Sequence, residues 1–200
     1  NTQALLDWAG NNTVTASSLT YNSDGSFSFD ASKVITVPMT NLKPVSAITQ
    51  ECWFRTTNNN TQVFIGSQYG NGSNNSYALW INGANGWAGG VNTTGTFNYQ
   101  TQSTTLLTNV WYHFVHTYDG TNQKLYINGI NVRTWGTTGN IIYGTNNTLL
   151  AVGNDWNSGY NSGASNGVKG QMPIAKIYNK ALTAAEVTQN FNALRGRYGI

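Results

Sequence analysis

Short runs in which apolar and polar residues alternate, each closed by glycine or asparagine, follow one another along most of this chain. Ser26–Asp30 places both of its phenylalanines on one face, and Ala47–Thr56 alternates over a longer stretch. A period of two residues marks a half-buried β-strand, because successive side chains of a strand point to opposite sides. The pattern predicts an all-β chain of many short strands.

The same pattern predicts the other strands and some of their turns. Asn128-Gly129 is the pair that most favours a type I′ hairpin, and Asp119-Gly120 marks a second turn. No internal repeat and no linker divides the sequence, so we expect a single domain over residues 1–200. Further strands are expected at Lys33–Val37, Gln62–Gly66, Ser76–Asn82, Gly86–Asn92, Trp111–Asp119, Gln123–Asn128, Asn131–Trp135, Thr148–Asn154 and Gln171–Tyr178.

One segment, residues 183–194, departs from this period. Its apolar residues Val187 and Phe191 are four positions apart, which is a helical spacing. Its first residue is a threonine, and Glu186 follows three positions later, so the two form a capping box that marks a helix start. We expect a helix that ends near Gly196 and lays its apolar stripe on the edge of the β structure.

The composition narrows the possible partners. Charged residues make up only 8% of the chain, so solubility rests on uncharged polar side chains such as the 29 asparagines. Aromatic residues reach 12%, which is enough to build a core.

The net charge of +3 comes without a dense lysine and arginine stripe, and we expect no nucleic-acid partner. No apolar run reaches the length of a membrane span, so we expect no membrane insertion. Cys52 is the single cysteine and is expected to be buried and unreactive.

Residues Trp111–Val132 read WYHFVHTYDGTNQKLYINGINV, with a Trp-x-His strand, a Tyr-Asp-Gly turn and a Leu-Tyr-Ile-Asn-Gly hairpin. This segment resembles the signature of laminin-G-like domains. Ile177–Val187 is similar to the closing strand and helix of that family, and Ser26–Asp30 to its early Phe-x-Phe-Asp strand. The resemblance implies a concanavalin A-like fold, which is a two-sheet antiparallel jelly-roll sandwich with a short C-terminal helix.

Both ends of the chain resemble laminin-G-like domains of phage and other viral structural proteins, through Asp7–Asn12 and Gln189–Gly199. The likeness implies a location on the virion surface or outside the cell. Family members carry a full strand before the opening turn, whereas six residues precede Asp7 here. We expect either residues 3–8 or an extended segment of a neighbouring structural-protein subunit to pair with residues 174–178.

Catalysis must be weighed, because this fold also hosts glycan hydrolases and lyases. Glycoside hydrolysis needs two carboxylates that flank the bond, and related glucanases carry them as Glu-x-Asp-x-x-Glu on one strand. No two of the seven acidic residues here lie within four positions of each other. A strand face shared by His116 and Tyr118 favours a structural, hydrogen-bonded pair over a lyase site. We expect no enzymatic activity.

Calcium is the cofactor that the resemblance implies. The family aspartate of the closing strand falls at Pro173, which has no side-chain oxygen. His113 and His116 are three positions apart on a strand and point to opposite faces, so they cannot hold one ion. We expect any calcium to bind at Asp155, Asn157 and nearby carbonyl oxygens.

Aromatic residues near turns are the candidates for glycan binding, because ring faces stack on sugars and amides bond to hydroxyls. Trp80 and Trp87 flank the turn at residues 82–85. The segment 154–167 is long for a connection between strands, and such loops are often functional. It contributes the remaining candidates Asn154, Asp155, Trp156, Asn157 and Tyr160. The alternative is a solvated loop with its tryptophan folded onto the sheet.

These features predict a non-catalytic adhesion domain that binds a cell-surface or matrix glycan. The alternative is a structural decoration or assembly module that contacts neighbouring subunits and binds no sugar. Exposure of Trp80 and Trp156 separates the two hypotheses.

Overall fold

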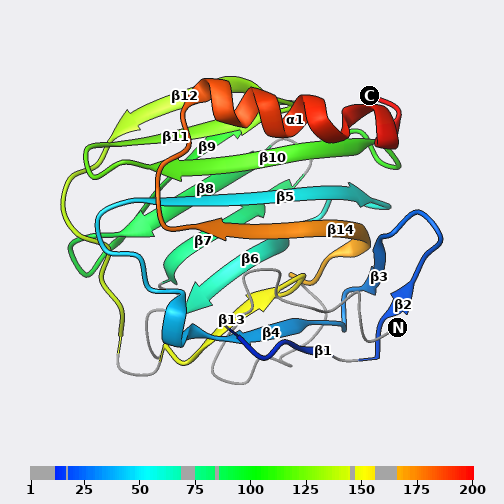
Figure 1. Ribbon diagram of the computed structural model, residues 1–200, viewed down its shortest axis with the longest axis horizontal. Helices are drawn as coiled ribbons and strands as arrows, with labels where there is room; N and C mark the ends of the chain where they lie inside the picture. The colour runs from blue at the N-terminus through cyan, green and yellow to red at the C-terminus, as the bar shows by residue number, and fades with distance from the viewer. Residues whose placement is uncertain (1–11, 17, 69–74, 84–85, 145–146, 156–165) are drawn as a thin grey trace.

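Two antiparallel sheets of seven strands face each other in a computed structural model of the protein (Figure 1). The structure describes residues 12–16, 18–68, 75–83, 86–144, 147–155 and 166–200. Sheet A contains, in spatial order, β1 (Thr15–Ala16), β4 (Ile35–Pro38), β13 (Leu149–Val152), β6 (Gln62–Gln68), β7 (Asn75–Ile81), β8 (Gly86–Asn92) and β9 (Phe97–Ser103). Sheet B contains β12 (Ile130–Gly136), β11 (Asn122–Ile127), β10 (Trp111–Tyr118), β5 (Ile48–Thr56), β14 (Lys169–Tyr178), β3 (Phe27–Asp30) and β2 (Thr20–Tyr21).

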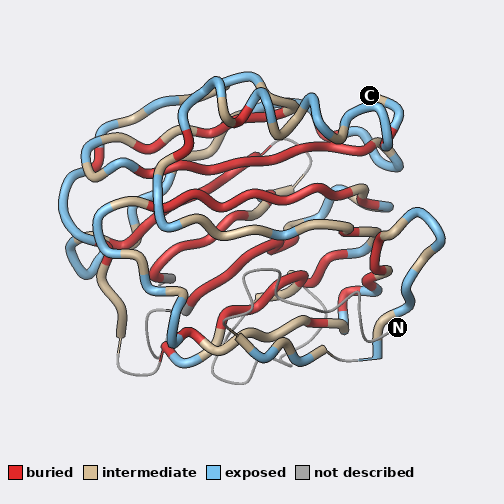
Figure 2. The backbone as a smooth tube through the Cα atoms, viewed as in Figure 1, coloured by how far each residue is buried: buried red, intermediate tan, exposed pale blue. Residues whose placement is uncertain are grey.

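The core lies between the two sheets, where alternate side chains of their central strands meet. Phe54 of β5 and Phe64 of β6 have ring centroids 4.1 Å apart. Trp87 of β8 meets the ring of Phe114 of β10 at 5.1 Å, edge to face. Cys52 is buried in the same cluster, as expected. Figure 2 shows the buried backbone running through the central strands. The all-β two-sheet prediction is confirmed.

The expected strands all form, with ends that differ by a few residues, and the Asn128-Gly129 turn is confirmed. Both turn residues have positive φ, 51° and 79°, as a type I′ turn requires. Three strands were missed by the sequence pattern: the two-residue β1 and β2, and β9. In sheet B, β14 pairs through its first residues with β3 and through residues 174–178 with β5. The expected partner of its second edge, residues 3–8, lies outside the described part of the chain.

Helix α1 (Ala184–Tyr198) begins at the predicted capping box and runs past its predicted end. The backbone N–H of Glu186 donates to the side-chain hydroxyl of Thr183. In return, the backbone N–H of Thr183 donates to the side-chain carboxylate of Glu186 at 2.8 Å. The helix ends at Gly199, which is left-handed with φ 72°. The expected stop near Gly196 is wrong, because one exposed glycine costs a helix only about 1 kcal/mol. Packing of the last turn against sheet B offsets that cost.

The helix covers the outer face of sheet B rather than the edge of the sandwich, which corrects our expectation. Phe191 stacks on Trp53 of β5 with centroids 5.9 Å apart, and Tyr198 packs on Trp111 of β10 at 4.7 Å. These two strands carry large apolar residues on both faces, so their outward side needs a cover as well. The described part of the chain has no helix long and apolar enough to cross a membrane.

One arginine joins the edges of the two sheets. Arg133, on the edge strand β12 of sheet B, donates to the carbonyl oxygen of Thr101 at 2.8 Å and to the side chain of Gln100 at 2.7 Å. Both acceptors belong to β9, the edge strand of sheet A. The sandwich is therefore fastened along this side by side-chain contacts.

Candidate functional site

The outer face of sheet A carries small residues in the middle of its central strands. The strand register aligns Gly66 of β6, Ala78 of β7 and Gly90 of β8 in one row, which ends at Tyr99 of β9. Neighbouring strands lie about 4.8 Å apart, so this row spans about 14 Å. Small side chains along it let larger groups from the two ends approach the sheet closely.

Three aromatic rings form a cluster on this face, which we call the aromatic patch: Trp80 of β7 with Phe97 and Tyr99 of β9. The Trp80 ring lies 5.7 Å from Phe97 and 5.2 Å from Tyr99, measured between centroids. A Cβ atom at Gly90 would lie 2.9 Å from the Phe97 ring, so the glycine is what lets that ring pack down. Tyr99 is 48% exposed, and the other two rings are half-buried. The patch therefore presents aromatic surface to solvent.

Two oxygen atoms face the opposite end of the row. The carbonyl oxygen of Asn154 and Oδ1 of Asp155 lie 3.9 Å and 4.0 Å from the position that a Cβ would take at Gly66. The side chain of Asn154 is itself occupied, because its amide donates to the carbonyl oxygen of Ala31 at 3.1 Å. It also accepts from the Asp155 backbone N–H at 2.8 Å. Asn154 thus contributes its backbone to this face, whereas its side chain fixes the loop.

The sequence-predicted site residues divide into three groups. Trp80 lies on the outer face and is partly exposed, which the glycan-binding hypothesis requires. Trp87 does not belong to the site: it is 0% exposed, points into the core and donates from its indole N–H to the Thr104 carbonyl oxygen at 2.7 Å. The physical reason is alternation, since Trp87 and Trp80 stand on opposite faces of paired strands. Trp156, Asn157 and Tyr160 lie outside the described residues.

Phe97 and Tyr99 were missed by sequence reasoning. They sit in the Phe-Asn-Tyr-Gln-Thr-Gln-Ser stretch of β9, where polar side chains outnumber apolar ones. The usable signal was their spacing of two, which places both rings on one face of a strand.

The acidic residue Glu51 is buried under α1 rather than open to a substrate. Its Oε2 accepts from the hydroxyl of Tyr178 at 2.9 Å and from the side chain of Asn190 at 2.8 Å. Its Oε1 lies 3.3 Å from His113 Nε2 and 3.4 Å from Lys176 Nζ. Burial raises the pKa of Glu51, but the contacts with His113 and Lys176 outweigh it and lower the pKa below its ordinary value.

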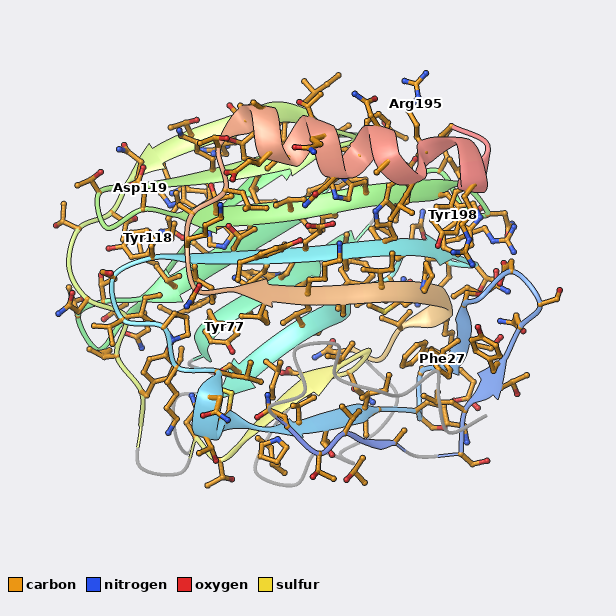
Figure 3. The ribbon with its side chains drawn as sticks, viewed as in Figure 1. Phe27, Tyr77, Tyr118, Asp119, Arg195 and Tyr198 are labelled. Atoms are coloured by element: carbon orange, nitrogen blue, oxygen red, sulfur yellow. The ribbon has the colours of Figure 1, made fainter. Side chains whose placement is uncertain are left out.

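The other acidic residues whose roles were predicted serve the fold. Asp119 accepts three hydrogen bonds from Thr121 and Asn122 within its own turn, at the end of the molecule far from Tyr198 (Figure 3). Glu186 caps α1 and also accepts from Lys180 at 2.5 Å. The turn and cap predictions are both confirmed.

The two histidines point to opposite faces, as expected. His113 lies under α1, whereas His116 lies in the interior between Gln50 and Gln123, with 2.9 Å contacts to both side chains. Burial lowers the pKa of His116 to about 4, so the ring is neutral near neutral pH. The hydroxyl of Tyr118 donates to the carbonyl oxygen of Gly139. His116 and Tyr118 therefore both have structural hydrogen-bond partners.

The expected calcium ligands are Asp155 and Asn157. The carbonyl oxygen of Asn154 and Oδ1 of Asp155 lie above Gly66, and calcium takes such oxygens, six to eight at a time. Asn157 lies outside the described residues. Among the described residues, no group of three or more His, Cys, Asp and Glu side chains could hold a metal ion.

Comparison with known proteins gives a family match and structural neighbours. The family model for the concanavalin A-like lectin/glucanases superfamily matches residues 29–188. No curated protein sequence matches the chain.

Three solved structures illustrate the structural neighbours. Domain 4 of an extracellular arabinanase from Geobacillus stearothermophilus, in complex with arabinotriose, shares 20% identity at a TM-score of 0.65, with 94% of this chain and 93% of that one covered. Botulinum neurotoxin type C, whose cell entry depends on two ganglioside molecules, shares 16% identity at a TM-score of 0.66, and the match covers 92% of this chain and 47% of that one. A heptameric pentraxin from Limulus polyphemus shares 18% identity at a TM-score of 0.56, and the match covers 73% of this chain and 70% of that one. At these identities the likeness shows the fold.

Proposed function

This chain belongs to the concanavalin A-like lectin/glucanases superfamily, and from that premise we propose that it is a non-catalytic domain that binds glycans on the outer face of sheet A. The observation that carries the proposal is the aromatic patch of Trp80, Phe97 and Tyr99. Exposed rings offer the apolar, polarisable faces on which the C–H side of a sugar ring stacks.

The geometry suits a short stretch of sugar chain. The rings of Phe97 and Tyr99 stand over the Gly90 end of the row, and the oxygens of Asn154 and Asp155 stand at its Gly66 end. One sugar would stack on the patch while hydroxyls of another donate to the two oxygens. Trp156, Asn157 and Tyr160 follow Asp155 in sequence, and we include them in the proposed site.

A binding role agrees better with the places of Glu51, Asp119 and Glu186 than catalysis does. Glu51 is fully buried with four partners, and Asp119 and Glu186 are held in a turn and a cap. Hydrolysis would need a pair of accessible carboxylates on either side of one bond. The proposed partner is a cell-surface or matrix glycan, met by a virion or an extracellular protein. The arabinanase neighbour, an extracellular enzyme with arabinotriose bound, supports this setting.

A glycan array probed with the wild-type chain and with Trp80→Ala tests the proposal. We expect the wild type to bind a defined set of glycans and the variant to lose them while keeping its circular dichroism spectrum. Absence of any bound glycan, or unchanged binding by a folded variant, would overturn the site. Binding of a protein partner in place of glycans would support the structural-module alternative.

A further inference from the structure

We infer that the chain holds a second binding site, a cleft at one end of sheet B that takes a sugar residue with a carboxylate or a sulfate ester. The cleft measures about 600 Å³. It lies on the outer face where β3, β5 and β14 run side by side, near the C-terminal end of α1. Six of the lining residues matter here, namely Ser28, Asp30, Arg55, Asn109, Lys169 and Gln171. The inference rests on the proposed function in one respect, that the ligand is a glycan.

Arg55 is held in a fixed orientation on the floor of this cleft. Its Nε donates to Oε1 of Gln171 at 2.9 Å, and its Nη2 donates to the same oxygen. Its guanidinium carbon lies 5.1 Å from the centre of the Trp111 ring, which in turn packs on Tyr198. A half-buried guanidinium is usually held by a carboxylate. Here a neutral amide holds it, and no ion pair among the described residues includes it, so its charge can meet that of a ligand.

The charges around the cleft leave it positive. Among the ion pairs of the described residues, none includes Arg55 or Lys169. Asp30 is the acidic residue of the lining, and its carboxylate already lies 3.9 Å from Lys33 Nζ. Beside the cleft, the Arg197 side chain donates to the Asp24 backbone. A hydrogen bond from Ser26 and the positive charges of Arg55 and Arg197 lower the pKa of the Asp24 carboxyl. Four cations therefore stand against two carboxylates here, and a carboxylate or sulfate ester of a ligand would meet a positive surface.

The backbone around the two cations is rigid. A Cβ at Gly170 would lie 2.0 Å from the carbonyl oxygen of Arg55, so β14 approaches β5 here as only glycine allows. The Lys169 N–H donates to the side chain of Gln62 at 2.8 Å, and its carbonyl oxygen accepts from the Thr57 N–H at 2.8 Å. Such a preformed site loses little entropy when a ligand binds.

The rest of the lining suits sugar hydroxyls. Ser28 contributes a hydroxyl, which also bonds to the side chain of Asn22, and Asn109 and Gln171 contribute amides. Hydroxyl and amide groups around a net positive charge match a sugar that carries a carboxylate or a sulfate.

The test uses an array on which carboxylated and sulfated glycans are printed beside neutral counterparts of the same skeleton. Three folded variants are compared with the wild type. Gln171→Glu keeps the shape of the cleft but gives Arg55 a carboxylate partner, and Lys169→Gln removes the exposed charge. Lys124→Gln, on β11 of the same sheet, removes a matched charge away from the cleft.

We expect the wild type to prefer the acidic member of each pair. Gln171→Glu should lower the affinity for acidic glycans about tenfold, as expected for a charged hydrogen-bonded contact. Lys169→Gln should lower it about threefold, as expected for an exposed ion pair. Lys124→Gln should leave the preference intact. The carboxylated and sulfated arms identify which anion is bound. Equal binding of acidic and neutral glycans, or equal loss in Lys124→Gln, overturns the cleft.

The outcome for the cleft is separable from that for the aromatic patch. Neutral glycans that bind and are lost in Trp80→Ala, without any acidic preference, overturn the cleft alone. Acidic glycans that are lost in Gln171→Glu but retained in Trp80→Ala overturn the patch alone. Absence of any bound glycan on the array overturns both.

Discussion

Asn190 of α1 donates a hydrogen bond of 2.8 Å to the fully buried carboxylate of Glu51 at the centre of β5. The same amide nitrogen lies 3.2 Å from the hydroxyl of Tyr178 on β14. This contact places a polar anchor in the middle of a helix that also packs on sheet B through aromatic rings. The helix and sheet B are therefore joined through one buried charge.

Replacing Asn190 with alanine should destabilise the protein by about 1–3 kcal/mol, because a buried carboxylate oxygen loses a donor. Urea denaturation followed by tryptophan fluorescence measures the change. Asn192→Ala, on the exposed side of the same helix, is the matched control and should stay within about 0.5 kcal/mol of the wild type. Equal effects of the two substitutions would contradict the anchoring role.

Stability should fall as pH drops from 6.5 to 4, because of His116. Its pKa is lowered to about 4 in the folded protein, whereas the unfolded chain binds a proton near pH 6.5. Between these values only the unfolded state is protonated at this site, so acid favours unfolding by about 1.4 kcal/mol per pH unit.

Denaturant unfolding across this pH range, on the wild type and on His116→Gln, isolates the contribution of His116. In the variant, the free energy of unfolding should change less steeply with pH, by the equivalent of about one proton taken up on unfolding. Glu51 adds a separate effect at lower pH: because its folded pKa is lowered, its contribution is present above its ordinary value of 4.5 and is lost below it. Identical slopes in the two proteins between pH 6.5 and 4 would refute the His116 assignment.

Tyr99→Ala should weaken a bound neutral glycan by about 1–2 kcal/mol, through loss of an aromatic stacking surface. Tyr21→Ala is the control, because Tyr21 is 43% exposed, close to the 48% of Tyr99, but lies on β2 of the opposite sheet. Isothermal titration with the best glycan from the array gives both affinities. Comparable losses in the two variants would mean that the patch is not the site. Trp156→Ala should cause a loss of the same size as Tyr99→Ala.

Calcium should raise the melting temperature if Asp155 and Asn157 form the expected site. A ligand at a hundredfold excess over its dissociation constant adds about 2.7 kcal/mol of stability. Asp155→Asn should abolish the rise in melting temperature. Magnesium should raise the melting temperature little, since it demands a tighter octahedral shell. An unchanged melting temperature in calcium would remove the metal from the account of this domain.

The strands that could be predicted are those whose alternation is strong and whose ends carry turn residues. β5 and β10 are of this kind, and the Asn128-Gly129 turn fixed the hairpin after them. β9 was missed because its polar residues hide the spacing of Phe97 and Tyr99. The end of α1 was misjudged because a local signal, Gly196, was outweighed by tertiary packing that the sequence does not display.

The candidate site was harder to predict than the fold. Alternation alone could have placed Trp87 in the core, since Val91, four residues further on the same strand, points the same way. The partners of Glu51 could not be found by spacing, because Lys176, Tyr178 and Asn190 follow it by 125 to 139 positions. Contacts of that kind depend on which strands become neighbours, and that is a property of topology.

The two hydrogen bonds that Arg133 makes to β9 act against self-association of this protein. An edge strand with free carbonyl groups is a template on which a second molecule can add a strand, and repeated addition leads to aggregates. The guanidinium of Arg133 occupies the carbonyl oxygen of Thr101 and places a charge beside it. A chain with so few charged residues has little electrostatic repulsion to keep its molecules apart in concentrated solution. Arg133 therefore removes one position on β9 at which the backbone of a second molecule could pair.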